Sequence, residues 1–368
     1  MEKLEFEYDF HSNYELMIKK NVYSSRGLCG LVNLGNKCFI TSILQCLNNS
    51  LKLTDFLLSN KFKNDVDVSK KKSEYYVLLS YLNLINNIWD SNQLITPKTF
   101  IENLSKFHKQ YFTLRQQDSH ECLMFILDLF HKSLSYEIEI ELTGSDDRDD
   151  NSQKNALLKQ SINTWKNHYE KGYSFIIETF NGLTINNVLC KNKECNDISN
   201  TFEPFNSLSL NLNNNTTLHD CFDDYFKDCD NIESWKCEKC NKSGCSKNTK
   251  VWSLPDYLII HLKRFNKDLS KNCNSINYPL TDLDLTKYIC PEKLDKNKYI
   301  YDCYAINYHT GSMEGGHYWS ACKNLDNNWY NFNDCNVSRY EKNSQLITKD
   351  AYILFYHRKF IKKNNLVI

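Results

Sequence analysis

The apolar pattern of this 368-residue chain changes character near its middle, and that change limits the possible folds more than any other feature. In the first half, apolar residues recur at helical spacing over residues 38–48 and 118–134. After about residue 175 the chain turns to short runs with the composition of strands. These runs cover 202–212, 257–265, 301–308, 317–323, 329–332 and 351–357. Helices followed by strands predict an α+β fold with segregated halves.

The composition favours one large unit and excludes several classes of protein. Glycine and proline number only 10 and 5, so long flexible linkers between domains are not expected. Hydrophobic residues make up 41% of the chain, which excludes whole-chain disorder. The 45 basic and 45 acidic residues balance, which argues against a protein built mainly to bind nucleic acid or an acidic membrane. Four stretches rich in Asn and Lys, at 60–72, 146–159, 211–217 and 266–275, are expected to be surface loops or partly disordered insertions.

The termini and the cysteines indicate the compartment. No run of eighteen apolar residues predicts a membrane span, and the charged N-terminus lacks the core of a signal peptide. The chain has 16 cysteines, and without an export signal we expect an intracellular protein, cytoplasmic or nuclear, with mostly free thiols. The cysteines then divide among a nucleophile, metal ligands and core residues.

The first candidate site is the segment 27–46, in which Gly35 and Asn36 precede Cys38 at the start of the predicted helix. A thiol at this position lies near unpaired backbone N–H groups and the positive end of the helix dipole, and both favour the thiolate. Asn33 lies on the turn five residues upstream, where its amide can serve as an oxyanion donor. Taken alone, the pattern fits a packed cysteine at a helix start better than a nucleophile. The catalytic interpretation therefore depends on a partner elsewhere in the chain.

That partner is His317, which a glycine-rich loop places at the start of a predicted strand. Sixteen and seventeen residues later, Asn333 and Asp334 end another short strand, so that either side chain can return beside His317. A cysteine nucleophile, a histidine base and an amide or carboxylate that orients the base form the triad of a thiol protease. A single histidine after two glycines is more often a surface turn residue, but together with the Cys38 segment it predicts nucleophilic catalysis.

The Cys38 and His317 segments resemble the cysteine and histidine boxes of the ubiquitin-specific protease family. Three further segments resemble family motifs in the same order: the helix motif at 116–130, the strand at 253–265 that crosses the palm, and the closing strand at 351–356. The resemblance covers about 27–357, nearly the whole chain. It implies a papain-like cysteine protease with thumb, palm and fingers, a helical N-terminal half and an antiparallel β C-terminal half. The implied domains are a variable extension at 1–26, a catalytic domain at 27–359 and a tail at 360–368, with the thumb at about 27–170 and the fingers and palm at about 171–359.

The resemblance also implies the reaction and the role of each residue. It makes the chain a deubiquitinase that hydrolyses the isopeptide or peptide bond after the C-terminal glycine of ubiquitin. By position, Cys38 is the nucleophile, His317 the general base, Asn333 the third triad member and Asn33 the oxyanion donor. Some family members carry Asp in place of Asn333, and Asp334 next to it stays open as the working third member.

The fingers of this family usually hold a zinc ion through two Cys-x-x-Cys pairs. Cys237 and Cys240 have this spacing, whereas Cys190 and Cys195 have four residues between them. Because the flanking segments keep the family register, the resemblance implies a two-residue insertion between these ligands, a spacing that zinc pairs tolerate. Cys245 stays open as a substitute ligand. The predicted cofactor is a structural zinc with no open catalytic position.

Three further residues are candidates for binding the ubiquitin tail. Asp118 and Glu121 have the spacing of a helix capping box, which needs no function, but the resemblance places their helix beside the tail channel. A carboxylate there can pair with the arginines of the tail. His309 is similar in position to a loop histidine near the tail site of the family. Lys37 stands where the family usually has Thr, and we expect its side chain to project to solvent.

Three functions compete on the sequence alone. The first is a thiol isopeptidase acting on ubiquitin or, as a variant, on another ubiquitin-like modifier. The second is a ubiquitin-binding scaffold without turnover, which the intact Cys38, His317 and Asn333 speak against. The third is a zinc-organised interaction module, which leaves the two boxes unexplained. The expected partners are ubiquitin and ubiquitinated proteins, with room for an activating subunit, and neither nucleic acid binding nor membrane insertion is expected.

Overall fold

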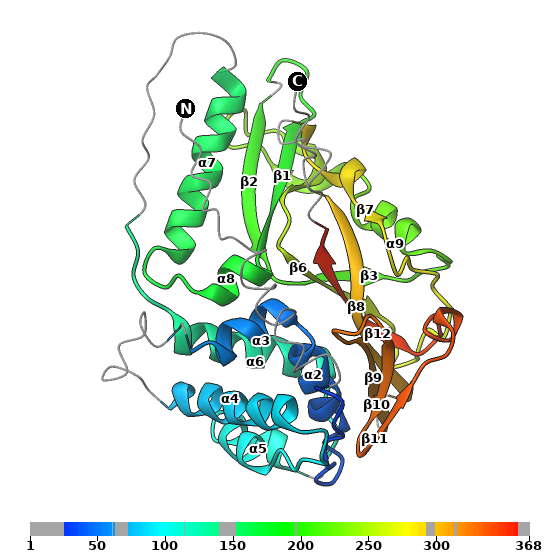
Figure 1. Ribbon diagram of the computed structural model, residues 1–368. Helices are drawn as coiled ribbons and strands as arrows, with labels where there is room; N and C mark the ends of the chain where they lie inside the picture. The colour runs from blue at the N-terminus through cyan, green and yellow to red at the C-terminus, as the bar shows by residue number, and fades with distance from the viewer. Residues whose placement is uncertain are drawn as a thin grey trace, which may run out of the picture.

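The computed structural model describes residues 26–60, 62, 73–113, 115–139, 152–195, 197–291, 299–312 and 315–359. Within them, helices occupy the N-terminal half and two largely antiparallel sheets the C-terminal half (Figure 1). The predicted α+β fold with segregated halves is therefore confirmed. In the described part of the chain, no helix combines the length and apolar character needed to cross a bilayer.

The thumb is a group of helices at one end of the molecule (Figure 1). It contains α2 (Cys38–Asn48), α3 (Leu51–Leu58), α4 (Glu74–Asp90), α5 (Lys98–Ser105), the short η3 (Lys109–Phe112) and α6 (Ser119–Leu134). Every residue of α2 is buried, because α6 packs on one side of it and β8 and β9 on another. The helices predicted at 38–48 and 118–134 are confirmed as α2 and α6. Asp118 is the N-cap of α6, so this helix begins where its capping residue predicted.

The palm is the larger sheet, with the strand order β11-β10-β9-β8-β12-β6-β3 and β7 paired with β8. Its strands are β3 (Leu208–Asn211), β6 (Tyr257–Lys263), β7 (Leu283–Asp284), β8 (Ile300–Gly311), β9 (Gly316–Lys323), β10 (Trp329–Asn333), β11 (Asn336–Arg339) and β12 (Ala351–Arg358). One face shares a core with the thumb, in which Ile259 and Phe355 of the sheet join Ile43 of α2 and Ile126 of α6. The other face packs against α9 (Leu218–Tyr225), η4 (Thr286–Tyr288) and a segment containing η7 (Asn343–Gln345). The palm is thus covered on both faces.

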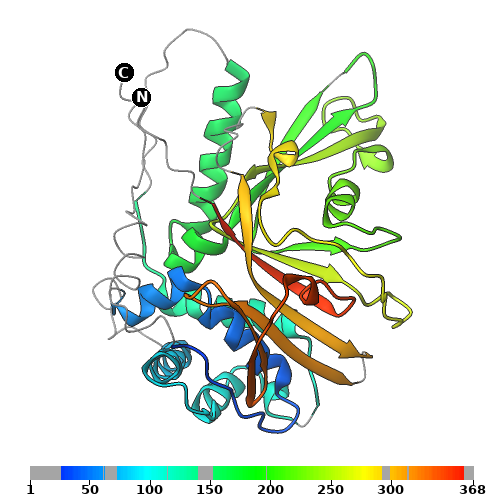
Figure 2. The same ribbon diagram turned by 45° about the vertical axis from the view of Figure 1, so that its right-hand side comes forward.

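The fingers are the second sheet, with the order β2-β1-β5-β4, and they extend away from the thumb (Figure 2). The strands are β1 (Gly182–Cys190), β2 (Ile198–Phe205), β4 (Cys229–Lys236) and β5 (Ser243–Ser253). Helix α7 (Ser152–Tyr169) packs on β2, and α8 (Phe175–Phe180) leads into β1. The prediction of a loop at 146–159 was wrong for residues 152–159, because Leu157 of α7 packs into a small core with Phe202 and Trp252.

One strand prediction needed correction, three strands were missed, and one loop prediction lies mostly outside the described residues. The run predicted at 202–212 is two strands, because β2 ends in the fingers at Phe205 and β3 begins in the palm at Leu208. The fingers strands β1, β4 and β5 were not predicted, because polar residues occupy buried and half-buried positions in β1 and most of β5, and they hide the strand pattern. Residues 212–217 and 266–275 are loops as predicted, whereas 60–72 falls largely outside the described residues.

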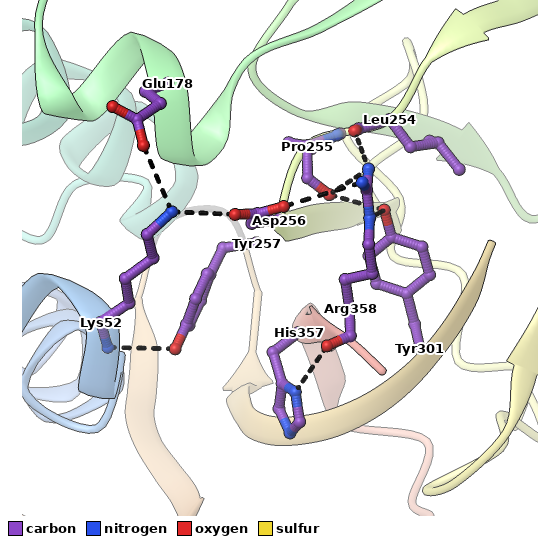
Figure 3. Close-up of polar contacts among 9 residues, drawn as sticks. All are labelled: Lys52, Glu178, Leu254, Pro255, Asp256, Tyr257, Tyr301, His357 and Arg358. Carbon is purple, nitrogen blue, oxygen red and sulfur yellow. Dashed lines mark hydrogen bonds and ion pairs between the residues drawn. The ribbon is translucent and has the colours of Figure 1, made fainter. Parts of the chain in front are cut away.

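A polar network centred on the buried Lys52 joins the thumb to the palm at the root of the fingers (Figure 3). The Nζ atom of Lys52 in α3 lies 2.8 Å from Asp256 and 3.5 Å from Glu178 of α8, and its side chain is 7% exposed. Asp256 also lies 3.7 Å from Arg358 at the end of β12. The Lys52 backbone N–H donates to the hydroxyl of Tyr257, 3.1 Å away. We call these residues the Lys52 network.

Candidate active site

Cys38 is the first residue of α2, and a left-handed turn directs the chain into it. Gly35 and Asn36 have φ angles of 75° and 54°. Such angles are readily adopted by Gly and tolerated by Asn, which explains these residue types before the helix. The thiol therefore lies at the first helical turn, where backbone N–H groups lack intrahelical acceptors. Cys38 is only 1% exposed.

His317 and Asn333 approach Cys38 from two adjacent strands of the palm. His317 is the second residue of β9, and its Nε2 donates to Oδ1 of Asn333 at the end of β10, 2.7 Å away. The other ring nitrogen is then left to contact the thiol. A hydrogen bond with Cys38, and a further one with Asn333, raise the pKa of His317 to about 9. The structure thus brings together Cys38, His317 and Asn333 from α2, β9 and β10.

Asp334 has different partners from its neighbour Asn333. It lies in the turn between β10 and β11 with a φ of 48°. Its Oδ2 accepts from Nδ2 of Asn33 at 3.0 Å, and its Oδ1 accepts from the hydroxyl of Thr41 at 3.2 Å. The geometry therefore gives the two neighbours separate partners: Asn333 bonds His317, and Asp334 bonds Asn33.

The Asn33 amide is held at both ends in the loop before α2. Its Oδ1 accepts from the backbone N–H of Lys37 at 2.8 Å, while one Nδ2 hydrogen bonds Asp334. The expectation that Lys37 projects to solvent was wrong. Its side chain is 3% exposed, and Nζ donates to the carbonyl of Thr113. Burial lowers the pKa of Lys37, while the neighbouring Cys38 opposes that shift.

Gln116 lies at the site, although no role for it was predicted from the sequence. Its Oε1 accepts from the backbone N–H of Gly316 at 2.7 Å, and its Nε2 donates to the carbonyl of the same residue. The same Nε2 lies 3.5 Å from the Sγ atom of Cys38. The available signal was its position at the start of the 116–130 motif, immediately before a helix that packs on α2.

Four cysteines gather at the tip of the fingers. Cys190 ends β1, Cys195 lies in the turn before β2, and Cys237 and Cys240 lie between β4 and β5. The sulfurs of Cys190 and Cys240 are 3.7 Å apart, those of Cys195 and Cys237 are 3.9 Å apart, and all four lie within 4.8 Å of one another. A tetrahedron with metal–sulfur bonds of about 2.3 Å has edges of about 3.8 Å, so this group fits a metal ion. Cys245 lies outside the group, with its sulfur 4.0 Å from the carbonyl of Ile232.

With this geometry established, comparison with known proteins identifies the family. A family model described as ubiquitin carboxyl-terminal hydrolase matches residues 29–356. The chain belongs to the ubiquitin carboxyl-terminal hydrolase family. The resemblance to the ubiquitin-specific proteases stated from the sequence is confirmed.

Three similar proteins illustrate the extent of the match to this hydrolase family. Ubiquitin carboxyl-terminal hydrolase Usp2 of Drosophila melanogaster is 33% identical over 342 residues, covering 91% of this chain and 35% of that protein. Ubiquitin carboxyl-terminal hydrolase 2 of Bos taurus is 32% identical over 351 residues, covering 91% and 56%. This chain therefore spans about half or less of the length of these relatives. Among solved structures, the SAGA DUB module of Ubp8, Sgf11, Sus1 and Sgf73 bound to monoubiquitin contains a chain with a TM-score of 0.70 and 25% identity, over 92% of this chain and 71% of that chain.

Two of the expected tail-binding residues lie at the start of α6. The Asp118 carboxylate accepts from the backbone N–H groups of His120 at 2.6 Å and Glu121 at 3.3 Å, and from the hydroxyl of Tyr352. The capping interpretation is confirmed for Asp118, although the described contacts do not include the reciprocal Glu121 bond of a full capping box. Glu121 is exposed on the first turn of this helix.

The third expected tail-binding residue, His309, is buried in β8 with 2% exposure. Its ring packs against Tyr318 with centroids 4.4 Å apart, and its Nδ1 lies 3.1 Å from the Nζ atom of Lys271. Burial, with the charge of Lys271, lowers the pKa of His309 to about 4. His309 is therefore a buried, neutral ring in β8, whereas the resemblance implied a loop histidine at this position.

Proposed function

We propose that this chain is a cysteine-type deubiquitinase, which hydrolyses the isopeptide or peptide bond after the C-terminal glycine of ubiquitin. The observation that carries the proposal is the alignment of Cys38, His317 and Asn333 across the boundary of thumb and palm, in a chain of the ubiquitin carboxyl-terminal hydrolase family. A scaffold that only binds ubiquitin does not need a base whose pKa is raised by contact with a thiol.

The first half of the reaction forms a thioester. His317 takes the thiol proton, and the Cys38 sulfur attacks the carbonyl carbon of the terminal glycine. The oxyanion accepts hydrogen bonds from the second Nδ2 hydrogen of Asn33 and from the first turn of α2. When the tetrahedral intermediate collapses, the C–N bond breaks and His317 gives its proton to the leaving amine. Asn333 keeps the ring oriented during both transfers, as the 2.7 Å bond to Nε2 supports.

The second half of the reaction releases ubiquitin. A water molecule loses a proton to His317 and attacks the thioester carbonyl, and the same oxyanion donors act again. The C–S bond breaks, the free carboxylate of ubiquitin leaves, and Cys38 returns to its starting state. Asp334 contributes by holding Asn33, which fixes the oxyanion donor without placing a charge directly on the ring.

The four cysteines of the fingers are proposed to hold a structural zinc. Four thiolates complete a tetrahedral shell and leave no position for catalysis. The ion would join the β1–β2 turn to the β4–β5 turn, in the fingers, which contain the smallest of the three apolar clusters among the described residues. Metal analysis should give one zinc per chain in the wild type and in Cys245→Ser, and a large loss in Cys237→Ser. Equal zinc content in all three would contradict the assignment.

The tail contacts and the domain limits complete the proposal. Glu121 is the better partner for the arginines of the ubiquitin tail, because Asp118 already accepts from the start of α6 and from Tyr352. His309 would act through the channel wall, by packing, since it is buried. We further propose that 27–359 is the catalytic domain and 1–26 a variable extension, and that the enzyme acts inside the cell on ubiquitinated proteins. An activating subunit is compatible with this arrangement.

The direct test uses a ubiquitin probe with an electrophile at its C-terminus. Wild-type protein should form a covalent adduct, and folded Cys38→Ala should form none while still binding ubiquitin. A folded, zinc-replete wild type that binds ubiquitin without forming an adduct would favour the scaffold interpretation. Adducts with probes of other ubiquitin-like modifiers, in the absence of an adduct with ubiquitin, would redirect the proposal to those modifiers.

A further inference from the structure

We propose that Gln116 is a positioning residue that holds His317 at the Cys38 sulfur by acting as a substitute strand partner for Gly316. The inference rests on the proposed function, because it concerns the same base and nucleophile. The side-chain amide of Gln116 presents one donor and one acceptor to one residue: Oε1 accepts from the Gly316 N–H at 2.7 Å, and Nε2 donates to the Gly316 carbonyl. This pairing imitates the two hydrogen bonds that a neighbouring strand would make.

The palm sheet leaves this part of β9 without a strand on one side. β8 pairs with β9 from Gly311↔Gly316 onward, but among the described strands β10 pairs with β9 only over Ser320–Lys323. His317 therefore lies on a stretch with a strand neighbour on one side only, next to the turn of the β8–β9 hairpin. On the other side, the backbone N–H and C=O groups of this stretch need hydrogen-bond partners from outside the sheet. Gln116 supplies the missing partner one residue before His317.

Residue 316 is a glycine, which agrees with close packing around the start of β9. A Cβ atom on Gly316 would lie 2.0 Å from the carbonyl oxygen of Thr310 and 2.5 Å from Nε2 of His309. Only glycine therefore fits between β8 and Gln116 at this point. The backbone is enclosed on one side by Thr310 and His309 and on the other by the Gln116 amide, and this enclosure fixes where β9 presents the His317 ring.

The contact with the nucleophile gives the amide a second effect. Nε2 has two hydrogens, and while one bonds the Gly316 carbonyl the other faces the Cys38 Sγ atom 3.5 Å away. A neutral donor at this place favours the thiolate without competing with His317 for the proton. The alternative is that Gln116 only covers the thiol, which is 1% exposed. If the amide stabilises the thiolate, its removal should slow the alkylation of Cys38. If the amide only covers the thiol, its removal should make alkylation faster.

The experiment compares Gln116→Met, Gln116→Glu and the control Gln117→Met in the full chain. Met has nearly the same length without polar atoms, Glu keeps an acceptor but loses both donor hydrogens, and no hydrogen bond joins Gln117 to the described residues. Circular dichroism and thermal melting select variants that fold. Two activities are then measured: hydrolysis of a ubiquitin–fluorophore conjugate, giving kcat and KM, and alkylation of Cys38 by iodoacetamide from pH 5 to 9, followed by mass spectrometry of the Cys38 peptide.

For a positioning residue, Gln116→Met should lower kcat about tenfold to a hundredfold with KM changed less than about twofold, because small misplacement of a catalytic group carries such a cost. The alkylation profile should move to higher pH and the rate at pH 7 should fall. Gln116→Glu should fall further, since it places a carboxylate beside the thiolate, and Gln117→Met should match the wild type. Faster alkylation of Gln116→Met at pH 7, or unchanged kcat and profile, would overturn the inference. If the wild type hydrolyses no ubiquitin conjugate, the proposed function fails, yet the alkylation profiles still decide the role of Gln116.

Discussion

Thumb and palm meet at two polar junctions that are built from different chemistry. At the root of the fingers, the Lys52 network joins the two with full charges, in which Lys52 lies between Glu178 and Asp256 (Figure 3). At the candidate active site the same two parts meet through a thiol, an imidazole and neutral amides. A buried ion pair is costly to disrupt once one partner is missing, whereas a thiol–imidazole pair can exchange a proton at little cost. The Lys52 network is suited to holding the thumb and the palm in a fixed orientation, and the candidate active site is suited to proton transfer.

The largest effect should follow removal of the base at the catalytic junction. His317→Ala is expected to lower kcat/KM for a ubiquitin–fluorophore substrate by about 10³-fold, within the range for loss of a general base. Binding of ubiquitin should change little, because the ring does not support the fold core. The measurement is steady-state hydrolysis beside a ubiquitin affinity titration. A loss smaller than tenfold would remove His317 from the role of base.

At the other junction the expected effect is on stability. Lys52→Met leaves Asp256, whose side chain is 24% exposed, with Arg358 as its cation and removes the ion pair to the more exposed Glu178, so the free energy of unfolding should fall by about 2 kcal/mol. The matched control is Lys98→Met, because Lys98 pairs with Glu102 on the surface with 70% side-chain exposure, and its loss should cost less than about 0.5 kcal/mol.

Chemical denaturation of both variants measures these differences. Alkylation of Cys38 in folded Lys52→Met should keep the wild-type rate if the two junctions are independent. A slower rate in the folded variant would show that the network also sets the catalytic geometry, and the contrast between the junctions would then fail.

A smaller effect should separate Asn333 from Asp334. Because the bond to Asn333 raises the pKa of His317, Asn333→Ala should move the alkaline limit of activity to lower pH, and misorientation of the ring should lower kcat by about 10²-fold. Asp334→Asn should lower kcat through the Asn33 amide and leave the pH profile nearer that of the wild type, since its bonds go to Asn33 and Thr41. The pH dependence of kcat for each variant is the measurement. If Asp334→Asn shifted the pH profile and Asn333→Ala left it unchanged, Asp334 would be the partner of the His317 ring.

The sequence predicted which residues meet at the candidate active site far better than it predicted the Lys52 network. Cys38, His317 and Asn333 occur in motifs whose residue types have a chemical reason, and the fold brings them together. The helical periods of α2 and α6 also gave their limits almost to the residue. These features depend on local sequence, which a single chain displays directly.

What the sequence did not predict depends on contacts between distant segments. Lys52 and Asp256 are 204 positions apart, and nothing near either residue indicates a partner. The buried Lys37 side chain has its hydrogen-bond partner in the carbonyl of Thr113, 76 positions away. The role proposed for Gln116 depends on the part of the β9 edge that β10 does not cover. In the fingers, polar positions on β1 and β5 hid the strand period until the pairing was known. Long-range pairing of this kind leaves no periodic signal in one sequence.

The smallest expected effect is the pH dependence of stability at the catalytic junction. The folded-state pKa of His317 is raised from 6.5 to about 9, chiefly by the hydrogen bond with Cys38. A raised folded-state pKa means that the folded protein binds the proton more tightly than the unfolded chain does. The contribution of His317 to stability is therefore complete below about pH 6.5 and is lost as the pH rises through about 9.

The difference in unfolding free energy between the wild type and His317→Ala should accordingly be larger at pH 6 than at pH 9.5. The ring is partly exposed, so solvent screening keeps this difference small. Cys38→Ala removes the main cause of the shift and should reduce the pH dependence of that difference. Denaturant titrations of the wild type, the two single variants and the double variant, at both pH values, isolate the coupling free energy between Cys38 and His317. A coupling between Cys38 and His317 that does not change between pH 6 and 9.5 would mean that the pair does not share a proton in the folded state, and the contrast with the fixed charges around Lys52 would be lost.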